Sequence, residues 1–272
     1  MPERRVLDEA EARAFVDEVG LAFLFGEKGV EIPTLWGAVS GSRRPVPQDH
    51  HDPDVGRVWD WKDTLPARKE IYYGKWLRGK PTLVSLELLP AVYALSPNYG
   101  DPLDYIEQYE AGQLSVEARN VYEVLLNQGA LATSFLRQEA GLAGTGPVAR
   151  RFDAALQELQ IQLKIVKVGT SEASRWGYAY VYDLFARQFP DVRERAQQIS
   201  TDQAMEILLL RHLENVGVAS MAAGERLFRW DAWEWERVIS RLAQRGAIVC
   251  DIEVDGIRKP AIAHAGALSA LV

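Results

Sequence analysis

The stretch that decides the fold runs from Ser115 to Leu184 and reads SVEARNVYEVLLNQGALATSFLRQEAGLAGTGPVARRFDAALQELQIQLKIVKVGTSEASRWGYAYVYDL. Ser115 is a good N-cap for a helix that ends at Gly129. A short strand over 130–132, a helix capped by Thr133 or Ser134, and a third helix from Pro147 to about residue 160 follow. Two strands joined by a polar loop complete the order. Helix, strand, two helices and a β-hairpin are the winged-helix arrangement, and they indicate nucleic acid as a partner.

A similar order returns near the C-terminus. Ser200 with Gln203, and Asp231 with Glu234, form capping-box patterns that each begin a helix. Two strands then meet at Asp255-Gly256, a strong hairpin signal. The first 114 residues have a helix, a surface loop over 41–56, the aromatic helix WDWKDTLP and a hairpin over 69–86 turning at Gly79, which suggests a third, degenerate unit. We therefore predict a mainly helical α+β protein of tandem winged-helix units, divided into residues 1–114, 115–190 and 191–272.

Charge and composition limit the function classes. The 272-residue chain has a formal net charge of −7, which argues against a strongly basic nucleic-acid binder. Residues 1–114 hold 13 basic and 19 acidic side chains, whereas residues 115–183 hold 7 of each. A neutral domain binds phosphate only through a local basic face, and such binding is weak and salt-sensitive. One cysteine excludes a disulfide framework or a cysteine zinc site, and no stretch predicts a membrane span or secretion signal, so we expect a bacterial cytoplasmic protein.

In each of the two predicted winged-helix units after residue 114, the third helix has one face free for a DNA groove. In the first unit that face presents Arg150, Arg151 and Gln157, which suit phosphate, guanine and adenine edges. The following hairpin adds Lys164, Lys167 and Arg175 as phosphate contacts, with Trp176 expected to fold onto the core. In the second unit the face offers Arg237, Arg241 and Arg245, but its first turn is acidic, so packing or dimerisation is the favoured role.

Aromatic side chains concentrate between residues 59 and 76, where a core is the favoured interpretation and base stacking the alternative. Asp60 and Asp63 lie among them and are candidate catalytic carboxylates if a pocket exists there. Adjacent residues rarely converge on one ion, so His50, His51, Asp52 and Asp54 predict no metal site. Neither a nucleophile motif nor a phosphate-binding glycine loop is present, and no cofactor is expected. The aromatic side chains between residues 59 and 76, for which core packing or base stacking is considered, are Trp59, Trp61, Tyr72, Tyr73 and Trp76.

Several runs resemble the AlkZ-related proteins, distant relatives of the AlkZ/YcaQ crosslink-repair DNA glycosylases. They are WDWKDTLP, IYYGK, KPTLVSLE, ALSPNYGDPLDY and IVKVGTSEASRWGYAYVYDLF. The resemblance covers most of the chain and implies tandem winged helices. In the wider family it implies hydrolysis of N-glycosidic bonds of alkylated or crosslinked bases. There a Gln–apolar–Gln or Gln–apolar–Asp motif positions water, in a segment corresponding to Gly20–Glu27, which here contains neither Gln nor Asp. Gln160-Ile161-Gln162 matches literally but lies at a helix end, and we interpret it as coincidence.

Three hypotheses follow. The leading one is a winged-helix protein that binds double-stranded DNA on an AlkZ/YcaQ-like scaffold without the usual catalytic pair. The second is a DNA repair glycosylase that uses other carboxylates, with Asp60, Asp63 or Glu87 as candidates. The third is a protein-interaction module in which winged helices pair subunits, for instance in a homodimer, and the neutral charge of both units supports it.

Overall fold

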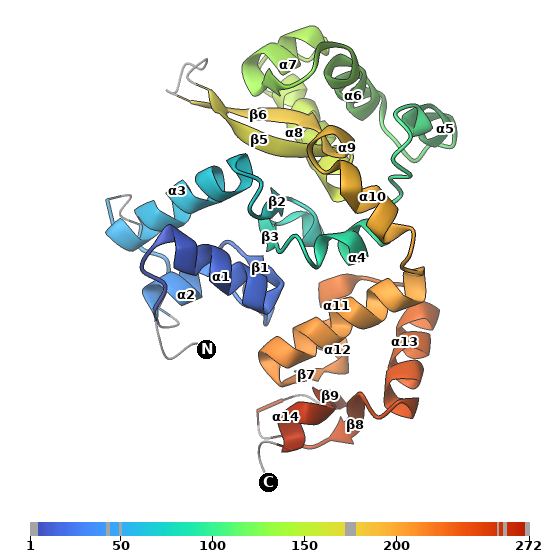
Figure 1. Cartoon of the computed structure of the whole chain (residues 1–272). Coiled ribbons are helices and arrows are strands. Elements are labelled where there is room, and N and C mark those ends of the chain that lie inside the picture. The colour runs from blue at the N-terminus through green and yellow to red at the C-terminus, as the bar shows by residue number, and fades with distance from the viewer. Residues whose placement is uncertain are drawn as a thin grey trace.

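The chain forms a mainly helical α+β structure with three small antiparallel sheets, shown by a computed structural model. The structure describes residues 5–41, 44–48, 51–171, 178–254, 256–257 and 260–269. Its elements repeat one order three times, in an N-terminal unit (residues 9–84), a middle unit (residues 115–184) and a C-terminal unit (residues 200–264), which Figure 1 shows in blue to green, green to yellow, and orange to red.

The N-terminal unit contains the full set of elements. Asp8 caps its first helix, and Gly20 ends it with φ 71°. The predicted loop over 41–56 is too long, because Asp52 accepts the backbone N–H groups of residues 54 and 55 and Pro53 begins the third helix. That helix tolerates Pro66 in its last turn. The elements are α1 (Glu9–Val19), β1 (Leu21–Phe23), α2 (Leu35–Ser40), α3 (Pro53–Ala67), β2 (Tyr72–Gly74), η1 (Leu77–Gly79) and β3 (Thr82–Val84).

The middle unit follows the order predicted from its sequence. Ser115 accepts the N–H of Ala118 and caps the first helix, which ends at Gly129. The predicted cap of the second helix is wrong: Thr133 is already its first residue, and Ala132 precedes it. The elements are α6 (Val116–Gln128), β4 (Leu131–Ala132), α7 (Thr133–Glu139), α8 (Pro147–Ile161), β5 (Ile165–Ser171) and β6 (Ala179–Leu184).

The C-terminal unit also follows its predicted order. Ser200 and Gln203 form the expected capping box at the first helix, and Glu234 accepts the backbone N–H of Asp231 at the third. Of the predicted Asp255-Gly256 turn, Asp255 lies outside the described residues. The elements are α11 (Thr201–Val216), β7 (Val218–Ser220), α12 (Met221–Phe228), α13 (Ala232–Gln244), β8 (Ile248–Ile252) and β9 (Ala261–His264).

The three sheets share one topology. The last strand of each unit lies at the centre, giving the orders β1-β3-β2, β4-β6-β5 and β7-β9-β8, and all pairs are antiparallel. Each unit is thus three helices with a short strand after the first helix and a β-hairpin at the end. The order predicted for the middle and C-terminal units is observed, and the N-terminal unit has it too.

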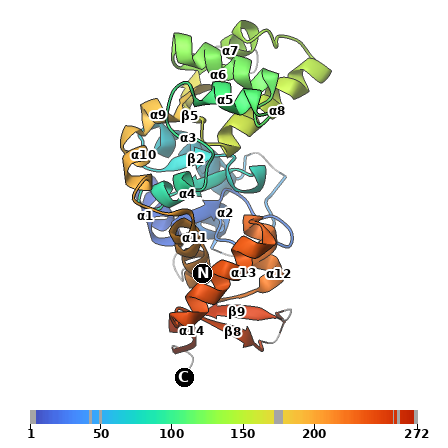
Figure 2. The ribbon, with the colours of Figure 1, turned by 90° about the vertical axis from the view of Figure 1, so that its right-hand side faces the viewer.

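The units are not stacked in chain order. In two perpendicular views the N-terminal unit lies between the middle unit and the C-terminal unit (Figures 1 and 2). On one side, α3 packs against β5 of the middle unit. On the other, Arg211 and Asn215 of α11 donate to the carbonyl oxygens of Glu18 and Val19 at 3.0 and 2.8 Å. The connecting helices are α4 (Leu89–Ala94), α5 (Asp104–Glu110), α9 (Phe185–Gln188) and α10 (Pro190–Ala196), and α14 (Ala265–Ser269) follows the last hairpin.

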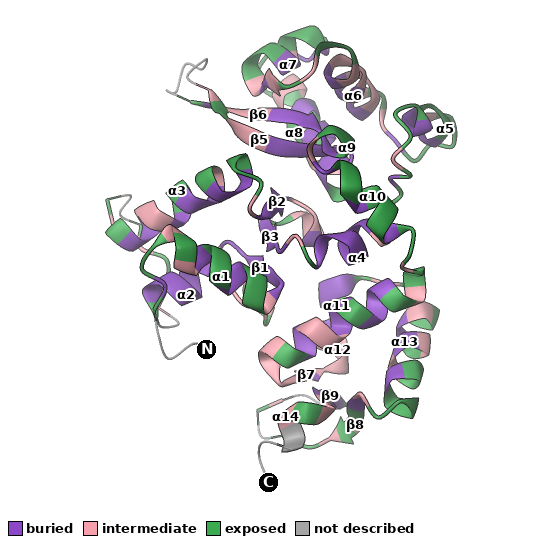
Figure 3. Cartoon of the chain, viewed as in Figure 1, coloured by how far each residue is buried: buried purple, intermediate pink, exposed green. Residues whose placement is uncertain are grey.

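Buried side chains form three clusters rather than one core. One lies within the N-terminal unit and one mainly within the middle unit. The largest joins the sheet of the N-terminal unit and the base of the β5–β6 hairpin to α4, α9, α10 and the C-terminal unit. In Figure 3 the base of the β5–β6 hairpin and the inner faces of α3 and α4 are buried, whereas the outer face of α13 is exposed. The connecting helices therefore fix the units to one another through packed apolar surface, which decides where candidate functional residues can reach solvent.

Candidate nucleic-acid interface

The first turns of α8 in the middle unit are open to solvent. Gly146 precedes the helix with φ 60°, Pro147 occupies its first position, and no side chain caps it. Arg150 is exposed and has no hydrogen-bond or ion-pair partner among the described residues. Arg151 is exposed as well, and its Nη1 pairs with Glu117 of α6 at 3.2 Å. The start of α8 thus offers uncapped backbone N–H groups and two exposed guanidinium groups, and both are groups that bind phosphate.

The second half of α8 is closed by the N-terminal unit. Gln157, predicted to face a DNA groove, lies half-buried against Gly79, where a Cβ atom would stand 2.5 Å from its Nε2. Gln160 is buried, accepts the N–H of Lys75 at 3.3 Å and donates to the carbonyl of Leu156 at 2.9 Å. Only the first half of α8 is therefore available to a groove, and the prediction for Gln157 is corrected by its contact with η1.

Lys164, predicted as a hairpin contact to phosphate, is a buried residue. Its side chain has 0% exposure, and its Nζ pairs with Asp104 of α5 at 2.6 Å. Burial lowers the pKa of Lys164, and the Asp104 carboxylate opposes that shift. The lysine therefore ties the hairpin base to the connecting helix and does not reach solvent. Arg175 and Trp176, from the same prediction, lie outside the described residues.

Lys167 is also buried, at the junction of two units. Its Nζ pairs with the Asp63 carboxylate of α3 and donates to the carbonyl of Lys62 at 3.1 Å. Lys62, itself 0% exposed, pairs with the same Asp63 oxygen at 2.7 Å. Burial and the neighbouring Lys62 ammonium lower the pKa of Lys167 to about 8, against the attraction of Asp63. Two lysines from different units thus share one carboxylate. The prediction that Lys167 contacts phosphate is therefore corrected, and Asp63, a candidate catalytic carboxylate, is occupied by an ion pair with both lysines.

Aromatic rings enclose these two lysines. Lys62 Nζ lies 4.8 Å from the Trp59 ring centre and 5.0 Å from that of Tyr180, while Lys167 Nζ lies 4.6 Å from Tyr180 and 4.8 Å from Tyr73. Cations over ring faces are favourable at these distances. Two further rings extend the set. The ring centre of Phe25 lies 5.7 Å from that of Trp59, and the ring centre of Tyr178 lies 5.8 Å from that of Tyr180. We call the set Phe25, Trp59, Lys62, Tyr180 and Tyr178, with Lys167 and Tyr73 beneath, the lysine–aromatic row.

The aromatic concentration between residues 59 and 76 divides into core and surface. Trp61, Tyr72 and Tyr73 are buried, as the core interpretation predicts. Trp59 differs, since 43% of it is exposed, and Trp76 is half-buried against the largest cluster. The core interpretation therefore holds for the three buried rings, and Trp59 is the aromatic side chain of this segment that most clearly reaches solvent.

The third helix of the C-terminal unit uses its basic side chains for packing. Arg237 pairs with Asp202 at 2.5 Å, and both Arg241 and Arg245 pair with Glu206 at 2.6 Å. The two carboxylates belong to α11 of the same unit, and Glu206 is buried. Each guanidinium thus has a carboxylate partner within the unit, which agrees with the packing role predicted for this helix.

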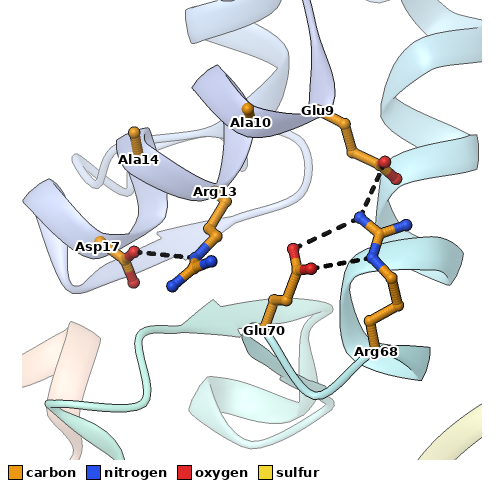
Figure 4. A pocket seen from close by; sticks show the side chains of 7 residues that line it. All are labelled: Glu9, Ala10, Arg13, Ala14, Asp17, Arg68 and Glu70. Atoms are coloured by element: carbon orange, nitrogen blue, oxygen red, sulfur yellow. Dashed lines mark hydrogen bonds and ion pairs between the residues drawn. The ribbon is translucent and has the colours of Figure 1, made fainter.

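The described residues line two cavities that bear on a candidate site. The larger, of about 490 Å³, is a surface hollow between α1 and the end of α3 (Figure 4). Its charged side chains pair with one another: Arg68 with Glu9 at 2.8 Å and with Glu70 at 3.0 Å, and Arg13 with Asp17 at 3.4 Å. Hydrogen bonds from Thr64 and Arg68 lower the pKa of Glu9. The smaller, of about 260 Å³, includes the ion-paired Lys164. The charged side chains named for the two cavities are thus paired within the protein.

Within the part of the chain that the structure describes, no three His, Cys, Asp or Glu side chains come together as a metal site. His50, from the histidine-rich loop, lies outside that part. Among the described helices, none has the length and apolar content needed to cross a bilayer.

Comparison with known proteins decides the family. The model of the family described as AlkZ related matches residues 6–229. The chain belongs to the AlkZ-related family. No curated protein matches it. Among solved structures, the DNA glycosylase AlkZ of Streptomyces sahachiroi is similar, with a TM-score of 0.60 and 15% sequence identity over 99% of this chain and 67% of that chain. At that identity the likeness establishes a shared fold.

Residues 21–25, in the segment where the family resemblance led us to expect a catalytic motif, are apolar. Residues 21–24 are buried, and Phe25 packs on Trp59. The literal match elsewhere is structural, since Gln160 is buried and Gln162 donates to the carbonyl of Gln113 at 3.1 Å. Asp60 and Glu87 are exposed and line neither cavity. Asp63, the third candidate, pairs with both lysines of the row, whereas Asp60 directly follows Trp59 in sequence.

Proposed function

We propose that this AlkZ-related protein binds double-stranded DNA through the middle unit, which acts as a winged helix. The first half of α8 enters a groove, with Arg150 and Arg151 contacting phosphate or guanine. The chain does so without the Gln–apolar–Gln or Gln–apolar–Asp pair. A cytoplasmic location is part of the same proposal, because the DNA would be reached there.

The observation that carries this proposal is the division of α8. Its second half is covered by the N-terminal unit through Gln157 and Gln160, while Arg150 at its start stays exposed without a partner among the described residues. A helix that serves packing alone would have its cations neutralised, as Arg241 and Arg245 are in α13. The contrast between the two third helices supports α8 as the helix that faces DNA.

Binding measurements test this proposal. Fluorescence anisotropy with a labelled duplex at low salt is expected to show binding that weakens as salt rises, because phosphate contacts release counterions. Changing Arg150 to Ala together with Arg151 to Ala removes two such contacts. Arg13→Ala with Arg195→Ala is the matched control, because it removes two exposed guanidinium groups that pair with exposed carboxylates elsewhere on the protein. Equal loss in both double variants would contradict a specific role for α8.

A second function, hydrolysis of an N-glycosidic bond, is supported by Asp60. This exposed carboxylate follows Trp59 directly, and the structural neighbour is a DNA glycosylase. Abasic-site formation on alkylated duplexes, lost in Asp60→Asn and retained in Glu87→Gln, would establish it. Light scattering with and without DNA decides whether subunit pairing, the third hypothesis, accompanies or replaces DNA binding.

A further inference from the structure

The lysine–aromatic row lies at the junction of the N-terminal and middle units. Lys62 comes from α3 of the N-terminal unit, Tyr180 comes from β6 of the middle unit, and Tyr178 directly precedes that strand. Figure 1 shows α3 beside the β5–β6 hairpin, where it packs against β5. Two ammonium groups share the single Asp63 carboxylate, so one positive charge remains without a carboxylate in the trio. Burying such charge is costly unless something offsets it. The rings over both ammonium groups supply part of that offset.

The outer end of the row is exposed. Trp59 has 43% and Tyr178 has 52% of its surface in contact with solvent, although rings of this size are usually covered in a folded protein. Tyr180 lies between them in the row and is half-buried, and Lys62 lies under both Trp59 and Tyr180. The molecule therefore displays aromatic surface directly above positive charge.

Asp60 is an exposed acid on the same helix as Trp59 and Lys62. It lies one turn before Thr64, whose hydroxyl donates to Glu9 of α1. Residues four apart share one face of a helix, so Asp60 lies on the side of α3 that turns toward α1. Trp59 is the exposed ring above the buried Lys62.

We infer that the lysine–aromatic row is a binding site for an unpaired nucleobase of DNA, with Trp59 and Tyr178 as the stacking surfaces. Every base has a π-face that stacks on such rings, and the flanking phosphates are attracted by the lysine charge beneath them. This inference rests on the proposed DNA binding and adds its preferred substrate: a duplex with an extrahelical or unpaired nucleotide. The exposed start of α8 would hold the paired part of the same duplex.

The test compares two labelled duplexes that differ by one unpaired nucleotide. The wild-type protein is expected to bind the bulged duplex about 5-fold or more tighter than the fully paired one, since stacking contributes about that much per base. Trp59→Ala and Tyr178→Ala should abolish this preference while binding to the paired duplex stays unchanged. Trp59→Phe should keep most of it. The matched control is Tyr99→Ala, which removes another exposed ring far along the chain.

A second readout does not depend on variants. An environment-sensitive 2-aminopurine at the unpaired position is expected to lose fluorescence on binding wild-type protein, because stacking on an indole or phenol ring quenches it. Equal affinity for the two duplexes, or unchanged 2-aminopurine emission, overturns the inference even if Arg150-dependent duplex binding is seen. Failure of both duplexes to bind instead overturns the proposed function, so the two failures are distinguishable. Thermal melting confirms that each variant folds.

Discussion

Changing Asp63 to Asn is expected to destabilise the junction between the N-terminal and middle units. The amide keeps the shape of the side chain but removes the carboxylate that pairs with Lys62 and Lys167, whose side chains are 0% and 1% exposed. Removing one partner of a buried ion pair typically costs 3–5 kcal/mol, and the 25% exposure of Asp63 favours the lower end, about 3 kcal/mol. In a chain of this size that loss corresponds to a fall in Tm of roughly 6–12 °C.

Urea denaturation measures this loss, and its pH dependence identifies the cause. The folded-state pKa of Lys167, about 8, is below its ordinary value of 10.5, so burying the ammonium costs stability below pH 8 and the cost disappears as the pH rises toward 10.5. The loss caused by Asp63→Asn should therefore be smaller at about pH 9 than at about pH 7. Adding Lys167→Met to Asp63→Asn should restore much of the stability, because one unpaired buried charge is removed.

The control for this experiment is Asp191→Asn, which removes an exposed carboxylate paired with Arg195 at 3.5 Å. Exposed ion pairs contribute about 0–1 kcal/mol, so little change is expected there. An Asp63→Asn variant within about 0.5 kcal/mol of the wild type would refute the reasoning. A loss that stays constant with pH would show that Lys167 does not contribute to it.

Two further predictions concern stability. His212 is buried with an unpartnered Nδ1, and burial lowers its pKa to about 4, so unfolding takes up a proton between about pH 6.5 and 4 and stability falls by about 3 kcal/mol as the pH drops through that range. His212→Leu should flatten this part of the pH profile of the unfolding free energy, and an unchanged slope would show that other groups cause it. Glu206→Gln should cost about 1–3 kcal/mol in urea denaturation, because the buried carboxylate accepts hydrogen bonds from Arg241 and Arg245. The exposed Glu214→Gln serves as its control, and similar losses in the two variants would argue against a special role for Glu206.

The sequence predicts best what depends on neighbouring residues. The Ser115 cap, the Ser200–Gln203 capping box and the stop at Gly129 all appear as expected, because each is a contact within one turn of chain. The element order of the middle unit follows from such local signals. Even the early start of α3 was visible in principle, since Asp52 followed by Pro53 is a helix-start pattern.

The lysines of the β5–β6 hairpin show what the sequence did not reveal. The sequence places Lys164 and Lys167 in an apolar strand of the predicted wing, where lysines suggest phosphate contacts. Their actual partners, Asp104 and Asp63, lie 60 and 104 residues away along the chain. Their burial arises because α5 and α3 cover the hairpin, and long-range packing of this kind leaves no local pattern. The alternation of Tyr178, Tyr180 and Tyr182 was the available signal that this strand has a special face.

The central claim is that the exposed start of α8 binds duplex DNA, and the salt dependence of affinity tests it most directly. Wild-type protein and the Arg150→Ala, Arg151→Ala double variant are titrated with a paired duplex between about 50 and 200 mM salt. The slope of log K against log salt should be shallower by about 1–2 in the double variant, one phosphate contact for each arginine that reaches the backbone. An identical slope and affinity in both proteins, or no binding at the lowest salt, would contradict the account.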